Sequence, residues 1–387
     1  MRDPHSRSIG GAQYPPLLMC ACCAALVLLL SSCSADLAVQ RDAQQAEQAL
    51  PGTPYSLVCI IHGDGDYLYH DTDGNATRAD EVALAAAKRV AQRNPEAEVF
   101  LFHQKPRRHF LFFFPLRDGE FSYYRNGRLI AEGSYWRDEG GSPLDPELTL
   151  FRRFRADTLR ERVTVFMYFG HEIPEFDGAG YHASSPDRAF TVQDLAEGLK
   201  GFTPHPGRFD LMILSTCFGG TPYTIGTLGP FAQTIIASPD NLHLSYFDLH
   251  SLERLDLRVR KGDVPAFAKT FAHQAFDRLT KDVQTAVSVA VYDVDRVQAF
   301  LRSVETKYDR TLTELKGMAQ TTAGVGHCDC ADLPSYVRPA MSEGIELFYR
   351  PARFGRSKYK QEHSGWGCWR ETAQQPHTTQ TKEPALE

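Results

Sequence analysis

Two apolar stretches in the middle of the chain have the pattern of buried strands, and each leads to a residue able to do chemistry. Residues 163–170 lead to His171, and residues 209–216 lead to Cys217. Apolar runs with little alternation are typical of parallel strands that are covered on both faces. Because the carboxyl ends of such strands meet at one edge of a sheet, we expect His171 and Cys217 to lie close together.

The stretch between these strands predicts the helix that connects them. Thr191 is a helix N-cap with an acid three residues later at Asp194, and Gly201 marks the expected end of the helix. Further strands, alternating with helical segments, are expected at residues 55–61, 98–103, 234–237 and 287–292. This alternation predicts an α/β fold with a mostly parallel central sheet of about six strands.

Residues 109–136 break the alternation. Asp-Gly and Asn-Gly turns separate aromatic runs there, which is the pattern of an inserted antiparallel β meander. We expect a C-terminal extension at residues 311–371. From residue 372 the chain is polar and rich in Thr, Gln and Pro, which predicts a disordered tail.

The composition is that of a globular chain. The 387 residues are 42% apolar and 23% charged, with a formal net charge of −6, so the chain can form a substantial core. Lysines and arginines are scattered along the sequence. Nothing therefore indicates a nucleic-acid partner.

Residues 1–32 have the pattern of an export signal. Arg2 and Arg7 precede an apolar run at residues 17–30, and that run is too short for a comfortable membrane span. We therefore expect these residues to lie outside the fold.

The tetrapeptide Leu-Ser-Ser-Cys that ends at Cys33 resembles a bacterial lipobox, in which the cysteine becomes the lipidated first residue. An ordinary cleaved signal peptide is the alternative. The resemblance implies a membrane anchor at Cys33 and a flexible tether over residues 33–54. It also implies a place in the bacterial cell envelope, with the outer membrane favoured in a Gram-negative cell because Ser34 rather than Asp follows the cysteine.

A thiol beside an imidazole is the minimum apparatus for nucleophilic acyl transfer. Histidine can take the thiol proton and leave the thiolate that attacks a carbonyl carbon. Gly219 and Gly220 follow Cys217 and would let the backbone approach a ligand closely. A buried cysteine is more often a small core residue, however, and a histidine at a strand end often only hydrogen-bonds, so composition leaves both interpretations open.

The order of these elements resembles that of the clostripain-like cysteine peptidases, members of the caspase-like α/β/α group. The matching features are the strand that ends at His171, the following helix, the strand that ends at Cys217, and the segments 235–238 and 285–297. The resemblance implies a three-layer α/β/α sandwich over residues 55–310. It also implies hydrolysis of peptide bonds by a dyad of His171 and Cys217, with the backbone N–H groups of Glu172 and Cys217 holding the oxyanion.

Two positions depart from the family pattern. Glycine usually follows the catalytic histidine, where this chain has Glu172, and aspartate often stands two residues before the cysteine, where this chain has Ser215. A preference for a basic residue at the cleavage site is therefore not implied. Asp240 and Asp248 are other acids that could line a substrate pocket beside Ser215, although solvated loop acids are the commoner case.

His62 and His182 are rivals for the role of general base. His62 ends the first expected strand, and His182 lies in a glycine-rich loop. Neither adjoins the strand that best matches the family, so His171 is favoured.

Two clusters of side chains raise the question of a metal. One is an oxygen-rich group that could hold Ca²⁺, although turn chemistry explains it equally well. Its members are Asp64, Asp66, Asp71, Asp73 and Asn75. The other comprises His327, Cys328, Cys330 and Cys368, which could bind zinc. In an exported protein a disulfide from Cys368 to Cys328 or Cys330 is the better interpretation, and no metal or other cofactor is assigned.

These patterns lead to hypotheses from different classes. The first is an exported, lipid-anchored cysteine endopeptidase acting on a peptide or protein. The second is a catalytically inactive surface lipoprotein of the same fold that binds peptides or a protein partner. Amidase or transpeptidase chemistry on cell-wall peptides is a weaker third.

Overall fold

The computed structural model describes residues 54–65, 67–70, 76–111, 113–138, 141–155, 162–203, 207–242, 247–255, 260–304, 325–332 and 343–371. The predicted signal segment, Cys33, the tether up to residue 53 and the tail from residue 372 lie outside these ranges. Within the ranges, no helix combines the length and apolar character needed to cross a bilayer.

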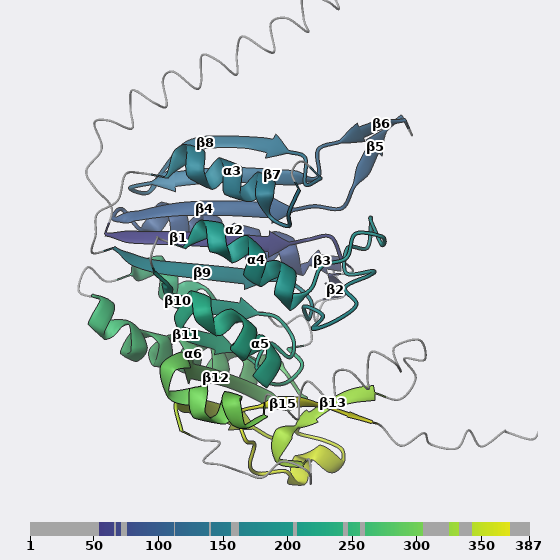
Figure 1. The fold of residues 1–387 in the computed structure, drawn as a ribbon, viewed down its shortest axis with the longest axis vertical. Helices are drawn as coiled ribbons and strands as arrows, with labels where there is room; N and C mark the ends of the chain where they lie inside the picture. The colour runs from purple at the N-terminus through teal and green to yellow at the C-terminus, as the bar shows by residue number, and fades with distance from the viewer. Residues whose placement is uncertain are drawn as a thin grey trace, which may run out of the picture. The chain divides into compact units, whose positions relative to one another are not determined.

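A nine-stranded sheet forms the centre of the fold, in the order β14-β12-β11-β10-β9-β1-β4-β7-β8 (Figure 1). The five central strands run parallel and are β11 (Ala232–Ala237), β10 (Phe209–Ser215), β9 (Val163–Phe169), β1 (Tyr55–His62) and β4 (Ala97–Gln104). The outer strands pair antiparallel and are β12 (Val287–Asp293), β14 (Ile345–Arg350), β7 (Gly119–Arg125) and β8 (Arg128–Tyr135). All six predicted core strands are present, but the sheet is larger than expected.

Helices cover both faces of the sheet, and a separate hydrophobic core fills each interface (Figure 1). One face carries α3 (Asp145–Phe154), α4 (Val192–Phe202), α5 (Pro222–Leu228) and the helical residues 294–304. The other carries α2 (Ala79–Arg93) and α6 (Val264–Asp282). Successive residues of a strand point to opposite faces, so each buried strand supplies both cores. The α/β/α sandwich predicted from the sequence is confirmed.

Short elements complete the described chain. A two-stranded ribbon joins β2 (Leu68–His70) to β3 (Ala76–Arg78). The 3₁₀ turns are η1 (Gly229–Phe231), η2 (His250–Arg254), η3 (Lys261–Asp263), η5 (Cys330–Asp332) and η6 (Arg356–Tyr359).

The helix between the two key strands begins as predicted. Thr191 and Asp194 form a capping box at the start of α4. The predicted end at Gly201 is wrong, because the helix continues to Phe202. A Cβ at position 201 would lie 2.2 Å from the side chain of Leu148 on α3, so this glycine permits close helix packing rather than stopping the helix.

The predicted meander divides into two parts. β7 and β8 form a hairpin whose turn residues Asn126 and Gly127 have φ angles of 55° and 76°, and this hairpin joins the central sheet beside β4. Residues before it form a separate ribbon of β5 (Arg108–Phe110) and β6 (Phe114–Leu116).

A C-terminal hairpin of β13 (Val325–Asp329) and β15 (Gly367–Glu371) lies near the end of the described chain. Cys330 and Cys368 form a disulfide, which confirms the disulfide interpretation over the zinc interpretation. Cys328 is not part of this disulfide.

Candidate active site

His171 and Cys217 follow the ends of neighbouring parallel strands. Phe169 at the end of β9 lies opposite Ser215 at the end of β10, and the Gly170 N–H donates to the Ser215 carbonyl at 3.3 Å. His171 and Cys217 each come two residues after this pair. Because neighbouring strands are about 4.8 Å apart, the two residues occupy equivalent positions at the carboxyl edge of the sheet.

The sulfur of Cys217 has two polar neighbours from the segment that follows β11. It lies 3.2 Å from Oδ1 of Asn241 and accepts a hydrogen bond from the Leu242 N–H at 3.3 Å. A backbone N–H directed at sulfur stabilises the thiolate relative to the thiol. Rotation of the Asn241 amide exchanges its oxygen and nitrogen, so this side chain can accept from S–H or donate to S⁻. Sequence reasoning did not identify Asn241.

The chain turns sharply just after Cys217. Phe218 has a φ angle of 49°, in the left-handed region that bulky residues rarely adopt. Its N–H donates to the Asp240 carbonyl at 3.1 Å, which ties the turn to the segment carrying Asn241. This hydrogen bond and the one from the Leu242 N–H to the Cys217 sulfur hold the strained turn in place.

The glycines after this turn pack against the protein. A Cβ at Gly220 would lie 2.2 Å from the Tyr292 hydroxyl, and a Cβ at Gly219 would lie 3.0 Å from the Thr216 hydroxyl. The expectation that these glycines make room for a ligand is therefore replaced by a packing explanation.

His171 is held by Tyr67, a residue that the sequence analysis missed. The His171 N–H donates to the Tyr67 hydroxyl at 2.8 Å, and the two rings stack with centroids 4.3 Å apart and planes 19° apart. Tyr67 is only 1% exposed. Its contacts fix both the backbone and the ring of His171.

His327 on the C-terminal hairpin joins the loops that follow the two candidate catalytic residues. Its Nε2 lies 2.7 Å from Oε1 of Glu172, and its ring stacks on Phe218 at 3.7 Å between centroids. Trp369 also packs against the His327 ring, and the Trp369 Nε1–H donates to Glu175 at 2.9 Å. Glu172 and Phe218, which directly follow His171 and Cys217, therefore both contact the His327 side chain.

The three predicted pocket residues have other contacts, and their role in a pocket stays a prediction. Ser215 is buried and its hydroxyl accepts from the Phe247 N–H at 3.0 Å. Asp248 accepts from the His250 N–H at 3.0 Å.

Asp240 lies 3.6 Å from Nε2 of His363. Burial acts to raise the pKa of this carboxyl, but hydrogen bonding and the charge of His363 hold the pKa below its ordinary value. Asp240 is the predicted pocket residue with a contact to the Cys217 turn, through its carbonyl.

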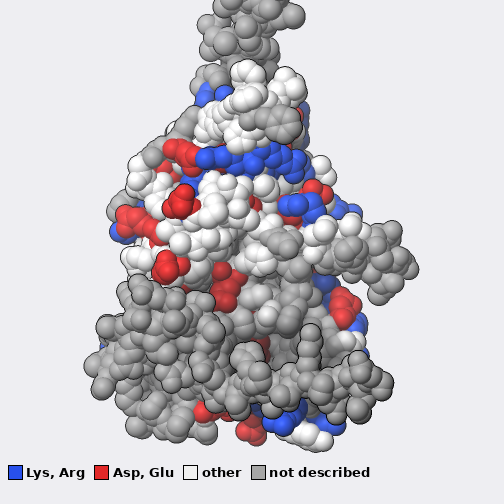
Figure 2. Space-filling model, turned by 90° about the vertical axis from the view of Figure 1, so that its right-hand side faces the viewer, with Lys and Arg blue, Asp and Glu red and all other residues white. Residues whose placement is uncertain are grey.

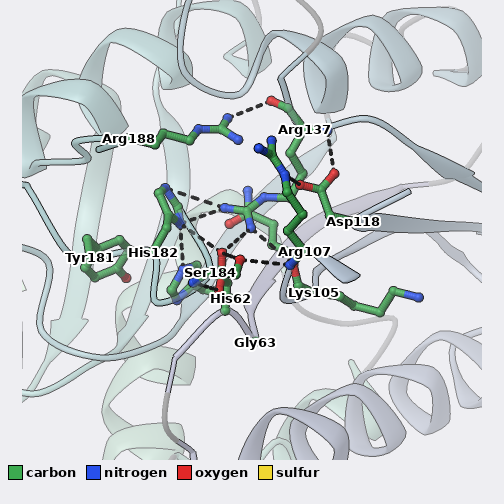
Figure 3. Close-up of polar contacts among 12 residues, drawn as sticks. His62, Gly63, Lys105, Arg107, Asp118, Arg137, Tyr181, His182, Ser184 and Arg188 are labelled. Carbon is green, nitrogen blue, oxygen red and sulfur yellow. Dashed lines mark hydrogen bonds and ion pairs between the residues drawn. The ribbon is translucent and has the colours of Figure 1, made fainter. Parts of the chain in front are cut away.

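The rival histidines belong to a buried network (Figure 3). His62 Nε2 lies 3.0 Å from His182 Nδ1, and Arg137 donates to that same nitrogen at 2.7 Å. Burial and then the neighbouring arginine charges lower the pKa of His182 to about 2, and burial lowers the pKa of His62 well below its ordinary value. Both rings are therefore engaged inside the network, which leaves His171 as the histidine beside Cys217 at the ends of β9 and β10.

Asp64 belongs to the same network. Its carboxylate lies 3.0 Å from Arg137 Nη1 and accepts from the Ser184 N–H at 2.9 Å and hydroxyl at 2.8 Å. The other predicted calcium ligands, Asp66, Asp71, Asp73 and Asn75, lie outside the described residues. Among the residues that are described, no group of three His, Cys, Asp or Glu side chains is arranged to hold a metal.

A pocket of about 610 Å³ adjoins this network and has Arg107, Arg137 and Arg188 among its lining residues. Arg188 donates to Asp138 at 2.9 Å, and Arg107 also pairs with Asp138. The guanidinium groups of this pocket therefore form ion pairs with carboxylates of the protein itself, Asp138 and Asp64.

Comparisons with known proteins support the fold. No protein-family model matches the chain, and no curated protein matches it in sequence. An inactive zymogen C11 protease from Parabacteroides distasonis aligns with a TM-score of 0.52 at 12% identity, covering 84% of this chain and 93% of that chain. A secreted C11 cysteine protease from Bacteroides thetaiotaomicron, in complex with an irreversible peptide inhibitor, aligns with a TM-score of 0.46 at 13% identity, covering 67% and 70%.

C11 is the clostripain-like group. At 12% identity the first of these similarities concerns the fold alone, and it agrees with the sandwich expected from the sequence.

Proposed function

We propose that this protein is a cysteine peptidase in which Cys217 is the nucleophile and His171 is the general base. The observation that supports this most is the placement of both residues just beyond the paired ends of β9 and β10. Ligands of open α/β sheets bind at this carboxyl edge. The substrate is a peptide or protein, in keeping with the fold shared with a C11 protease.

The reaction follows from the chemistry of the two side chains. His171 takes the proton from the Cys217 thiol, and the thiolate attacks the scissile carbonyl carbon. The C–N bond then breaks, and His171 returns the proton to the leaving amine. Water, deprotonated by His171, hydrolyses the thioester and regenerates the thiol.

We assign the oxyanion to the backbone N–H groups of Glu172 and Cys217. The His171 N–H is not included, because it donates to Tyr67. Glutamate in place of the usual glycine has a partner in this chain, since the Glu172 carboxylate pairs with His327.

A binding protein without turnover is the second candidate. The observation in its favour is the C-terminal hairpin, whose His327 contacts the residues after both His171 and Cys217. Such contacts would also suit a surface that holds a peptide without cleaving it.

The dyad is tested by single and double alanine substitutions. Cys217→Ala and His171→Ala should each abolish nearly all hydrolysis of a peptide library, and the double variant should be scarcely worse, because residues acting as a unit are non-additive. Each change should lower the free energy of unfolding by about 1 kcal/mol or less, because neither side chain is fully buried.

The matched controls are Cys328→Ala, which removes another thiol outside the disulfide, and His250→Ala, which removes an exposed histidine. Both should cleave at the wild-type rate. Alkylation of Cys217 by iodoacetamide should become slower in His171→Ala. Undiminished cleavage by Cys217→Ala would exclude the mechanism and favour the binding protein.

We also propose that the protein is exported and anchored by lipid at Cys33. Cys33→Ala should move the protein out of the membrane fraction, whereas Cys23→Ala, in the apolar run of the same segment, should not. Fractionation with membrane and soluble markers measures this. Tight membrane association of Cys33→Ala would place the attachment elsewhere.

A further inference from the structure

The ribbon of β5 and β6 is an exposed apolar surface that lies outside both hydrophobic cores of the described chain. Every described residue from 108 to 117 is exposed, and the ribbon contributes no residue to either hydrophobic core. Five large apolar side chains are 47 to 83% exposed, namely Phe110 58%, Leu111 62%, Phe113 83%, Phe114 63% and Leu116 47%. Isolated exposed apolar residues are ordinary, but a contiguous group of this size marks an interaction surface.

The ribbon has an apolar tip and a cationic base. In its register Phe110 pairs with Phe114 near the tip, and Arg108 pairs with Leu116 at the base. Arg117 follows at the base, exposed, and donates to the Ser134 carbonyl at 2.9 Å. The view onto this side of the molecule shows a band of Lys and Arg side chains beside uncharged ones (Figure 2).

We propose that this ribbon inserts its tip into the surface of a bilayer that contains anionic lipids. Each strand has three residues, so the ribbon reaches about 10 Å, which is the depth of interfacial segments. Phe and Leu side chains form the apolar face of segments that lie in the membrane interface, and arginines at the base would meet the lipid phosphates. In this orientation the apolar tip lies among the acyl chains and the arginines of the base lie at the level of the headgroups.

A bilayer fits these observations better than a protein partner does. The ribbon projects away from the sheet (Figure 1), whereas protein interfaces place polar residues around a packed apolar centre. The two strands pair only with each other among the described elements. Their outer edges therefore need water or headgroups as partners, which allows shallow insertion but not spanning.

The insertion would orient the candidate active site. The ribbon lies between the end of β4 and the start of β7, so it leaves the sheet at the carboxyl edge, where His171 and Cys217 also lie. The proposal does not depend on catalysis. It adds a second membrane contact to the one proposed at Cys33.

Tryptophan fluorescence on vesicles of phosphatidylethanolamine and phosphatidylglycerol tests the insertion in the full chain. A Phe113→Trp variant should show blue-shifted emission that is quenched by lipids brominated on their acyl chains. The matched control is Phe354→Trp, an exposed position at 67% outside the ribbon, whose emission should not respond. The wild-type spectrum is subtracted, because the chain has three tryptophans of its own.

Two further variants, each made with Phe113→Trp, separate the contributions of the apolar tip and of the arginines. Phe114→Asp should abolish the quenching, because a carboxylate is unfavourable in hydrocarbon. Replacing Arg108 and Arg117 by alanine should weaken the quenching on anionic vesicles. The Phe113→Trp protein that keeps both arginines should be quenched less on vesicles of phosphatidylcholine alone than on anionic vesicles. All these side chains are exposed, so thermal unfolding should stay at the wild-type temperature.

Absence of quenching in Phe113→Trp, with the protein folded, would overturn the proposal. Equal quenching of the Phe354→Trp control would also overturn it, because the contact would then not belong to the ribbon. A blue shift that appears only with a folded protein substrate, and not with vesicles, would assign the ribbon to protein docking instead.

Discussion

Tyr67 connects the candidate dyad to the buried polar network through hydrogen bonds of fixed direction. Its oxygen accepts from the His171 N–H and lies 2.8 Å from His62 Nδ1, to which it can donate its proton. His62 then carries its own proton on Nε2 and donates to His182 Nδ1, which also accepts from Arg137. The arginine can only donate, so the direction of the whole chain is set from this end. Both histidines are neutral, in agreement with their lowered pKa values.

Tyr67→Phe should lower the rate of peptide hydrolysis by about tenfold, a fraction of what general base catalysis contributes. The variant keeps the ring that stacks on His171 but loses the hydroxyl that binds the His171 N–H. Because the change acts through the orientation of His171, kcat should fall while KM stays constant. The alkylation rate of Cys217 should also reach its maximum at a higher pH.

Tyr168→Phe is the matched control. It removes the hydroxyl of another fully buried tyrosine, which contacts Tyr181 at 3.2 Å. If Tyr67→Phe and Tyr168→Phe lower kcat equally, Tyr67 is a structural residue and does not position the base. Gly65→Ala is an independent probe, because its Cβ would lie 2.6 Å from the Tyr67 ring and 2.9 Å from the His171 ring.

The sequence predicted some of these residues and missed others for a physical reason. His171 and Cys217 are recognisable because each follows a local apolar pattern. Tyr67, Asn241 and His327 contact them or their neighbours across 104, 24 and 155 positions, and no local pattern reports such contacts. The rivals His62 and His182 were recognised as notable, but only the fold shows that they bind each other.

At the scale of elements, the central strands were predictable because they are buried on both faces. β9 and β10 appear as uninterrupted apolar runs, and the capping box of α4 is a local signal at Thr191 and Asp194. The sheet edges were harder. β14 is half-buried along its whole length, and β8 is largely exposed, so neither has a continuous apolar run.

The C-terminal hairpin shows the same limit for cysteine pairing. Cys328 lies opposite Cys368 in the register of β13 and β15, yet the disulfide joins Cys368 to Cys330. Cys330 begins the turn η5 and is fully buried with Cys368, whereas Cys328 is partly exposed. Residue spacing alone could not distinguish the two pairings, because Cys328 and Cys330 lie only two positions apart.

At the scale of the whole molecule, several functional features gather at the carboxyl edge of the sheet. The candidate dyad, the neutral histidine network and the base of the β5–β6 ribbon all lie where the parallel strands end. Two large apolar cores hold the strands that position them. The network contains ionisable groups that are almost fully buried, so the stability of the whole fold is linked to pH.

We expect the free energy of unfolding to fall as the solution is acidified below about pH 6.5, the ordinary pKa of histidine. The folded-state pKa values of His62 and His182 lie below that value, to about 2 for His182, so the unfolded chain binds more protons. The stability is therefore fully present above pH 6.5 and is lost as the pH falls towards the folded-state pKa values. Between about pH 7.5 and about pH 5.5 the loss should be about 1 kcal/mol for each histidine.

Urea unfolding of the wild type and of His182→Asn at both pH values measures this contribution. Asparagine keeps an acceptor that Arg137 can reach but does not titrate, so the difference between the two pH values should shrink by about 1 kcal/mol. The absolute stability of the variant is not compared, because the hydrogen bonds of the network also change. His250→Asn, which removes an exposed histidine outside the network, should keep the wild-type difference. An unchanged difference in His182→Asn would show that His182 is not held neutral in the folded protein, and the directions assigned to the hydrogen bonds from Arg137 to Tyr67 would then be wrong.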